Sequence, residues 1–157
     1  MITIIQEIGL PETLKTDALR AAVACTLDHQ GMDPDKDVSI VITDDSRIQD
    51  LNAKYRRVDQ PTDVLAFPTN SDATFPDEFI DSEIANYLGD VVLSSERAQA
   101  QIESRAHDLR SELLLLIVHG VLHLCGHDHI DQTNKQTMWA AQQEILTILG
   151  VSVELPE

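Results

Sequence analysis

Runs of apolar residues, and the polar positions between them, divide the chain into nine predicted elements. Four short runs, two of them rich in β-branched residues, predict strands at residues 2–7, 38–43, 61–68 and 88–94. Longer runs predict five helices, at residues 10–31, 46–56, 96–106, 112–125 and 133–150. This order predicts an α+β fold, in which a small mixed sheet of about four strands packs against helices and the helix at 112–125 is central.

Short polar residues mark two of the predicted helix starts. Asp44 or Asp45 is suited to cap the helix at 46–56, and Ser94 or Ser95 the helix at 96–106. In the last helix, a stripe of apolar residues predicts a face packed on the core: Met138, Ala141, Ile145 and Ile148. Residues 69–87 are acidic and have no clear period, which predicts a surface excursion or a flexible flap.

Length and composition fit one domain spanning residues 1–157. With 157 residues and 43% hydrophobic content, the chain can bury a real core. The longest uninterrupted apolar stretch, residues 113–118, is too short to cross a bilayer, and the N-terminus lacks the basic region of a signal peptide. We therefore expect a cytoplasmic protein with no membrane association. The two cysteines form no CxxC pair, which argues against a disulfide framework or a cysteine-based zinc site.

The most informative residues are His119 and His123, which lie four positions apart in the apolar run ELLLLIVHGVLHLCGHDH. On an α-helix this spacing places both imidazoles on one face, about 40° apart. Because the helix is apolar on nearly every side, its histidines need partners that offset their desolvation. A metal ion is one such partner. Hydrogen bonds to the backbone inside the core are the alternative for an isolated pair.

Gly126 favours a metal site over backbone hydrogen bonds, because glycine readily ends a helix in a left-handed conformation. A chain reversal there would bring His129 back to the same ion, whereas a continuous helix would place it about 9 Å further along the axis. His127 and Asp128 are further polar candidates beside it. Cys125 is about 200° around the helix from His123 and is expected to face away from the site.

Three neutral imidazoles would leave a tetrahedral Zn²⁺ ion one open position, an arrangement typical of catalytic zinc. Water in that position could attack a carbonyl or a phosphorus centre. Zinc peptidases with the HExxH motif carry their general base immediately after the first histidine, and here that position is Gly120. Glycine accepts no proton, which argues against a peptidase. Gly120 also suggests the close approach of another backbone or of substrate.

A second candidate block, LNAKYRRVDQPTDVLAFP, carries Arg56 and Arg57 beside several polar residues. A guanidinium fork suits the oxygens of a phosphodiester. Either arginine could instead complement the helix dipole or pair with Asp59 or Asp63. The net charge of −16 argues against tight, nonspecific binding of duplex DNA, and no DNA specificity is expected. A local cluster of arginines can still focus a positive potential in a cleft.

At these residues the chain resembles a known family. HGVLHLCGHDH is similar to the HGxLHLxGxDH signature of the YbeY family of bacterial rRNA maturation factors, and LNAKYRRVDQPTDVLAFP and LGDVVLS resemble its two other hallmark segments. The resemblance spans essentially the whole chain. It implies a zinc-dependent, single-strand endoribonuclease that acts in maturation of the small-subunit rRNA 3′ end and in ribosome quality control.

The resemblance also implies roles for individual residues. His119, His123 and His129 fall on the family's metal ligands for one Zn²⁺ ion, and Arg56 falls on its functionally important arginine. His127 falls on a variable position, which favours His129 as the third ligand. The residues themselves suggest that Asp128 orients a ligand histidine.

The implied partners are ribosomal RNA and the small ribosomal subunit, with a ribosomal protein or a GTPase as a candidate recruiter. Two other hypotheses stay open. One is a zinc hydrolase of the peptidase type, and the other is a metal-stabilised, non-catalytic module that binds the ribosome. The attacking group also stays open, because RNA offers its own 2′-hydroxyl as an alternative to water.

Overall fold

The computed structural model describes residues 1–69 and 86–153, and a four-stranded sheet lies at its centre. The strands are β1 (Ile2–Gln6), β2 (Asp37–Thr43), β3 (Val64–Pro68) and β4 (Tyr87–Ser94). Their order in the sheet is β1-β2-β4-β3, and β1, β2 and β4 run parallel. Strand β3 pairs antiparallel with β4 at one edge. The predicted mixed sheet of four strands is therefore confirmed.

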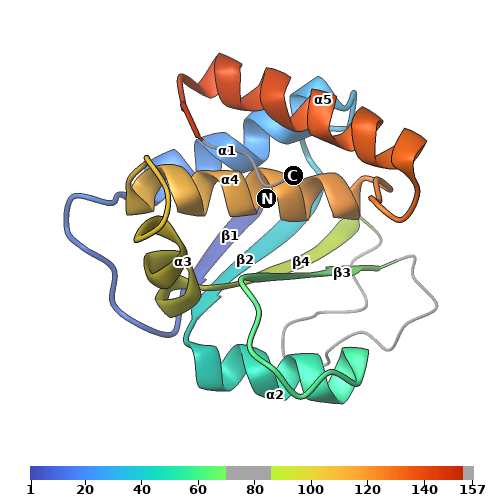
Figure 1. Ribbon diagram of the computed structural model, residues 1–157. Helices are drawn as coiled ribbons and strands as arrows, with labels where there is room; N and C mark the ends of the chain where they lie inside the picture. Colours follow the sequence, from blue (N-terminus) through green and yellow to red (C-terminus); the bar gives the residue numbers. More distant parts are fainter. Residues whose placement is uncertain (70–85, 154–157) are drawn as a thin grey trace.

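In the described residues, five helices cover the two faces of this sheet, which confirms the α+β fold class. They are α1 (Thr16–His29), α2 (Asp45–Arg56), α3 (Ser95–Ile102), α4 (Leu109–Leu124) and α5 (Gln132–Leu149). Figure 1 shows α2 on one face and α4 across the opposite face, where α1 packs beside α4 and against β1, and α5 packs on α4 and α1. Helix α4 thus contacts the sheet and the helices α1, α3 and α5, and 11 of its 16 residues are buried. This position explains why its sequence is apolar on nearly every side.

Local polar contacts decide where the helices begin and end. Asp44 and Ser94 are the N-caps of α2 and α3, and their side chains accept hydrogen bonds from the backbone N–H groups three residues later in the chain. Helix α4 begins at Leu109, earlier than predicted, because the Asp108 side chain caps it through the backbone N–H of Ser111. Helix α1 begins only at Thr16, since a turn joins Leu14 to Pro11 before it.

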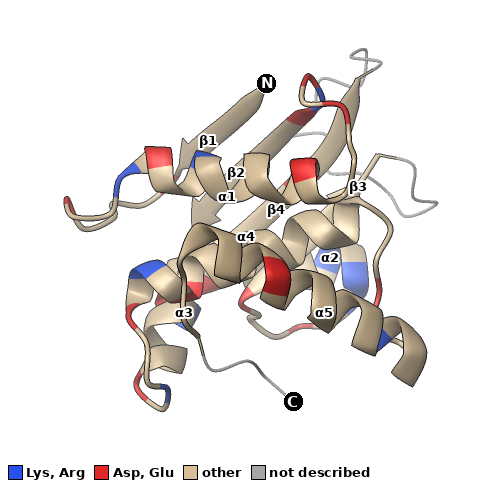
Figure 2. Ribbon diagram, turned by 90° about the horizontal axis from the view of Figure 1, so that it is seen from above, with Lys and Arg blue, Asp and Glu red and all other residues tan. Residues whose placement is uncertain are grey.

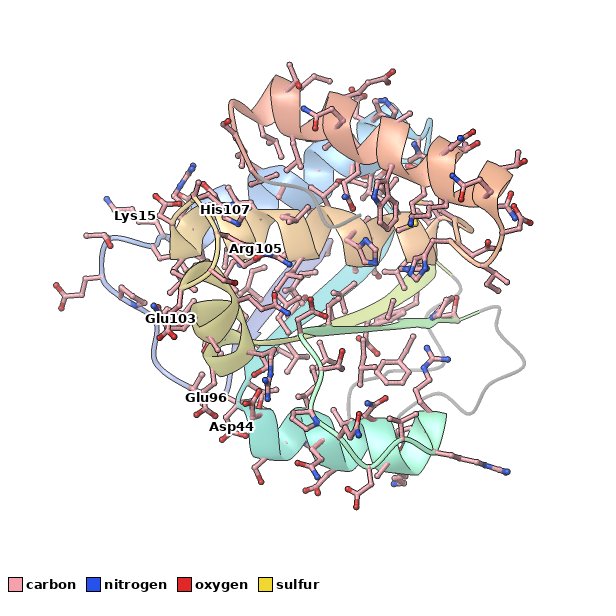
Figure 3. The ribbon with its side chains drawn as sticks, in the orientation of Figure 1. Lys15, Asp44, Glu96, Glu103, Arg105 and His107 are labelled. Carbon is pink, nitrogen blue, oxygen red and sulfur yellow. The ribbon has the colours of Figure 1, made fainter. Side chains whose placement is uncertain are left out.

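Helix α3 ends at Ile102, four residues before its predicted end. The turn after it contains Arg105, which forms an ion pair with a buried glutamate. Glu112 in α4 is fully buried, and both of its carboxylate oxygens accept hydrogen bonds from Arg105. Figure 3 shows Arg105 and His107 beside the start of α4, at the end opposite to its two histidines. The departure from helical geometry after Ile102 therefore lets Arg105 neutralise a charge in the core.

The predicted apolar stripe on α5 is correct at three of its four positions. Met138, Ala141 and Ile145 are buried, but Ile148 is 67% exposed. The buried face turns with the helix, so that Leu146 and Leu149 pack on the core in the last turn and Ile148 lies on the outer side. The flap predicted at residues 69–87 lies almost wholly outside the described residues. In the described parts of the chain, no helix combines the length and apolarity that a membrane crossing requires.

Candidate metal centre

The last turns of α4 present His119 and His123 toward one point. Their Nε2 atoms lie 3.2 Å apart, and the two rings meet edge to face with centroids 4.8 Å apart. The spacing of four residues sets this approach, because positions i and i+4 share a helix face. Both side chains are only partly buried, while the residues around them on α4 belong to the core. The helix therefore aims two imidazole nitrogens at the same small volume.

Gly126 brings the third histidine to that volume. Its φ of 101° is in the left-handed region, and the backbone N–H groups of Gly126 and His127 bond to the carbonyls of His123 and Leu122. This pattern is the Schellman motif, which reverses the chain directly after a helix. The ring of His129 then lies 5.5 Å from that of His119 and 5.2 Å from that of His123. The reversal predicted from the sequence is confirmed.

The three histidines form a group whose ligand atoms all lie within 4.8 Å of one another, so they could hold a metal ion. Among the histidine, cysteine, aspartate and glutamate side chains of the described residues, these three histidines form the group with this geometry, and Cys125 does not belong to it. Three imidazole nitrogens suit zinc, copper, iron and nickel, so the donor set fits a transition metal without choosing among them.

Two hydrogen bonds, each involving Nδ1 of an imidazole ring, orient His119 and His123. The Nδ1 of His119 lies 3.0 Å from Oε1 of Gln142 in α5, and the Nδ1 of His123 lies 2.9 Å from the carbonyl oxygen of His127. Both partners are oxygen acceptors, which favours the tautomer with the proton on Nδ1, and in that tautomer the Nε2 lone pair is available to a metal. The sequence assigned this orienting role to Asp128. Asp128 does not have this role for His119 or His123, because it accepts its hydrogen bond from the backbone N–H of Ile130, in the loop that carries His129.

The environment keeps these two imidazoles neutral. Burial lowers the pKa of His119, and burial together with the charges of His119 and His129 lowers the pKa of His123 to about 4. A neutral imidazole is the form that binds metal, so the desolvation of α4 prepares both ligands near pH 7. Trp139 closes the group on the α5 side, with its ring 5.7 Å from that of His119 and 5.6 Å from that of His129.

The histidines face a cavity of about 690 Å³ that opens between α4, β3 and the end of α2. Its polar lining includes the three histidines and four other residues able to bind or exchange protons with a ligand: Arg56, Asp63, His127 and Asp128. A cavity of this size accommodates a small ligand or a nucleotide unit.

Arg56, the last residue of α2, reaches this cavity across the edge of the sheet. It donates a hydrogen bond of 2.6 Å from Nη2 to the carbonyl of Ala66 in β3, and its guanidinium lies 5.4 Å from the centre of the Phe67 ring. No carboxylate among the described residues forms an ion pair with it, so the salt-bridge alternative for Arg56 is not supported. The edge strand thus holds the guanidinium in place and leaves most of its donors for a ligand.

Positive charge is concentrated at this end of α2. Lys54, Arg56 and Arg57 are three of the eleven Lys and Arg residues of a chain whose net charge is −16. Figure 2 shows this blue segment near the end of α2. Among the described residues that line the cavity, Arg56 is the cation, and it lies there with Asp63 and Asp128. Lys54 and Arg57 add positive charge beside the cavity on an otherwise acidic protein.

Gly120 serves packing between α4 and the sheet. A Cβ atom at this position would lie 2.5 Å from Cγ1 of Val91 in β4 and 3.3 Å from Cγ2 of Val64 in β3. The close approach suggested by the sequence is therefore present, but it comes from strand side chains and not from another backbone. HExxH peptidases carry a glutamate base at this position, and here Val91 and Val64 occupy the space that such a side chain would need.

Sequence reasoning overlooked Gln142 and Asp63. Gln142 carried a recognisable signal, because it is a polar residue on the apolar stripe of α5, between Ala141 and Ile145, and it is fully buried. Asp63 was considered only as an ion-pair partner for arginine. No local pattern could show that it reaches the cavity, because α4 and β3 meet only in the tertiary structure.

A group of three imidazoles, beside an arginine that has no ion-pair partner among the described residues, is the kind of site found in metal-dependent hydrolases. Residues 3–150 match the family described as "Endoribonuclease YbeY". The chain belongs to this family, whose members are named as enzymes that hydrolyse phosphodiester bonds in RNA. The resemblance seen in the sequence motifs is thereby confirmed.

Relatives named "Endoribonuclease YbeY" match nearly the whole chain. The protein from Desulforamulus reducens is 36% identical over 147 residues, with 94% of each chain covered. That from Carboxydothermus hydrogenoformans is 40% identical over 151 residues, with 96% of each covered. A solution structure of a Thermotoga maritima protein, 24% identical, has a TM-score of 0.58 and covers 95% of this chain and 89% of its own. This structure supports the fold.

Proposed function

We propose that this protein is a zinc-dependent endoribonuclease that cleaves single-stranded RNA during maturation of the small-subunit rRNA 3′ end and in ribosome quality control. The observation that carries this proposal is the convergence of three imidazoles and Arg56 on one cavity. Membership of the endoribonuclease family supports the reaction class. The imidazoles suit a metal, and the guanidinium suits the anionic phosphate that an RNA strand would bring.

Zinc fits the donors because His119, His123 and His129 supply three nitrogens and leave one tetrahedral position open. When bound, zinc would polarise the scissile phosphate or activate a water molecule. The protein's own part is to hold the ligands ready. Gln142 and the His127 carbonyl fix the two α4 imidazoles, so little reorganisation is needed when the ion or the substrate arrives.

Arg56 would bind the non-bridging oxygens of the phosphate and stabilise the charge that grows on them during bond cleavage. Its anchoring contacts with Ala66 and Phe67 limit the freedom of the side chain before substrate binds. The fork geometry of a guanidinium matches two phosphate oxygens at once. The packing of Val91 against Gly120 leaves no room for a glutamate at this place, which speaks against a peptidase of the HExxH type.

The strongly acidic surface suggests that the ribosome helps to deliver the RNA. A chain with a net charge of −16 repels a polyanion except near the positive end of α2, where Lys54, Arg56 and Arg57 lie. We therefore infer that the immature small subunit is the physiological substrate, and that a ribosomal protein or a GTPase bound to the subunit recruits the enzyme.

The test is to incubate zinc-loaded wild type and His119→Ala protein with immature small subunits and to map the rRNA 3′ ends. We expect 3′-end processing with the wild type and none with the variant. Wild-type protein that binds the subunits, loses thermal stability with a chelator and leaves every 3′ end unchanged would instead identify a non-catalytic binding module.

A further inference from the structure

Beside the three histidines and Arg56, the described lining of the cavity offers three side chains that could take a proton from the attacking group, Asp63, His127 and Asp128. His127 is already engaged, because its Nε2 lies 2.7 Å from Oε1 of Gln30. Gly120 occupies the place where a helix-borne carboxylate would act, and Val91 fills the space above it. Both α4 imidazoles are turned with Nε2 toward the metal position, which removes them as bases. The cavity contains two carboxylates among its described lining residues, Asp63 and Asp128.

Asp63 lies at the point where β3 meets α4. The next residue, Val64, is one of the two side chains that pack against Gly120, so the start of the strand lies beside the helix turn that carries His119. The backbone here is fixed, because the carbonyl of Asp63 accepts a 3.0 Å hydrogen bond from the N–H of Ser94. The negative charge of Asp63 also raises the pKa of His119, which places the carboxylate within electrostatic reach of the histidine group.

Two neutral donors hold the Asp63 carboxylate. Nε2 of Gln101 in α3 donates to Oδ2 over 3.2 Å, and the hydroxyl of Thr62 lies 3.4 Å from Oδ1. No Lys or Arg among the described residues forms an ion pair with Asp63. A carboxylate with two oxygens can accept about four hydrogen bonds, so acceptor capacity remains for a ligand. Asp63 is also outside the group of potential metal ligands, which leaves it free to act beside an ion.

The Asp128 side chain forms a contact within its own loop. Its Oδ1 accepts a hydrogen bond of 3.3 Å from the backbone N–H of Ile130, which shapes the loop that carries His129. It belongs to the same chain reversal as Gly126 and affects His127, and not His119, through its charge. The two carboxylates therefore differ in their contacts, and Asp63, on the sheet side, lines the same cavity as Arg56 and the histidines.

We propose that Asp63 is a catalytic residue and is the proton acceptor of the RNA cleavage reaction, an inference that rests on the function proposed above. As the attacking hydroxyl oxygen forms its bond to phosphorus, its proton passes to a carboxylate oxygen of Asp63. The bond from phosphorus to the leaving ribose oxygen breaks, and the leaving oxygen takes a proton from water. Strand β3 thus supplies the base that α4 cannot carry.

The test compares Asp63→Asn and Asp63→Ala with wild type on a labelled single-stranded RNA that carries the immature 3′ end of small-subunit rRNA. We expect kcat to fall by about 10²- to 10⁴-fold, the range associated with loss of a general base. KM and zinc stoichiometry should stay at their wild-type values. Formate should restore part of the rate of Asp63→Ala, because a small carboxylate can enter the open cavity, whereas chloride at equal ionic strength should not.

Asp59→Ala is the matched control, because Asp59 is an exposed carboxylate in the same loop whose side chain bonds to Gln49 and does not line the cavity. It should cleave RNA at the wild-type rate. Active wild type with an equally active Asp63→Asn would overturn the role of Asp63 alone, as would loss of rate that accompanies loss of zinc and resists formate. Wild type that cuts no RNA would overturn the proposed function, and Asp63 with it. If Asp63→Ala does not fold, the nearly isosteric Asp63→Asn decides.

Discussion

The contact between His119 and Gln142 shows how a residue in one helix can set the chemistry of a residue in another. Gln142 is fully buried, its Oε1 faces Nδ1 of His119, and its own Nε2 has no hydrogen-bond partner among the described residues. A buried amide with an unpaired donor is costly. Its presence in the core is therefore best explained by the acceptor that it offers to the histidine.

Replacing Gln142 by Leu should weaken zinc binding about 10- to 100-fold, the range found for partners of metal-binding histidines. Without an acceptor at Nδ1, the His119 proton can move to Nε2 and block the atom that binds the metal. Competition with a chromophoric chelator measures the affinity. Gln142→Glu keeps the acceptor and should bind zinc tightly, and Gln143→Leu, at an exposed neighbouring position, is the control. Equal affinities for wild type and Gln142→Leu would contradict this role.

Arg56 and Arg57 offer a comparison between adjacent arginines. Arg56→Glu should retain zinc, because the residue touches no imidazole ligand in the structure, but should lower kcat/KM for RNA by about 10²- to 10³-fold, as expected for loss of a donor to the developing charge. Arg57→Glu makes the same change of charge one residue away. Arg57 is exposed and does not line the cavity, so its loss should have a much smaller effect. Similar losses in both variants would indicate general electrostatic attraction instead of a specific contact.

At the scale of elements, β4 carries a second buried polar group. Asp90 is fully buried, accepts a hydrogen bond from the Tyr87 hydroxyl, and has no partner for Oδ2 among the described residues. Burial raises its pKa to about 7. In an unfolded chain the pKa of aspartate is about 3.9, so the folded protein binds more protons than the unfolded chain between these two values.

This difference predicts how stability depends on pH. The stabilisation from protonated Asp90 is complete below about pH 4 and is lost as pH rises through about 7, on the order of a few kcal/mol in all. Asp90→Asn mimics the protonated form and should remove this component. Urea unfolding of both proteins from pH 4 to 8 measures it, and the variant should gain stability relative to wild type as pH rises. A constant difference between them would show that Asp90 does not titrate in this range.

Element boundaries were predictable where a local contact sets them. Asp44 and Ser94 begin their helices as capping residues do, and the apolar run around His119 predicts a buried helix. The errors have tertiary causes. Helix α3 ends early as Arg105 turns toward the buried Glu112, and Ile148 is exposed because the last turn of α5 packs on the core through Leu146 and Leu149 instead. Neither event has a signal in the neighbouring residues.

At the scale of the molecule, a metal ion would join α4 to the loop that leads into α5. Ligand binding to the folded state alone adds about 2.7 kcal/mol at a free concentration 100 times the Kd. For a chain of this size, we expect chelation to lower Tm by roughly 5–10 °C. Differential scanning calorimetry with and without chelator measures the shift. His123→Ala should show little dependence on chelator, and a wild type indifferent to chelation would argue against a metal that links these segments.

The sequence by itself determined the three histidines and the fold class. Helical periodicity and the conformational freedom of Gly126 are local properties, so His119, His123 and the returning His129 could be predicted from neighbouring residues. The alternation of strands and helices likewise predicted an α+β fold with a mixed sheet.

Only the tertiary structure decided what surrounds those histidines. The order β1-β2-β4-β3 places β3 at an edge, where its carbonyl holds Arg56 and its first residues bring Asp63 to the cavity. Packing of α5 on α4 brings Gln142 to His119 across 23 positions of sequence. These contacts depend on how whole elements bury their apolar faces, and that is settled by the packing of the complete core.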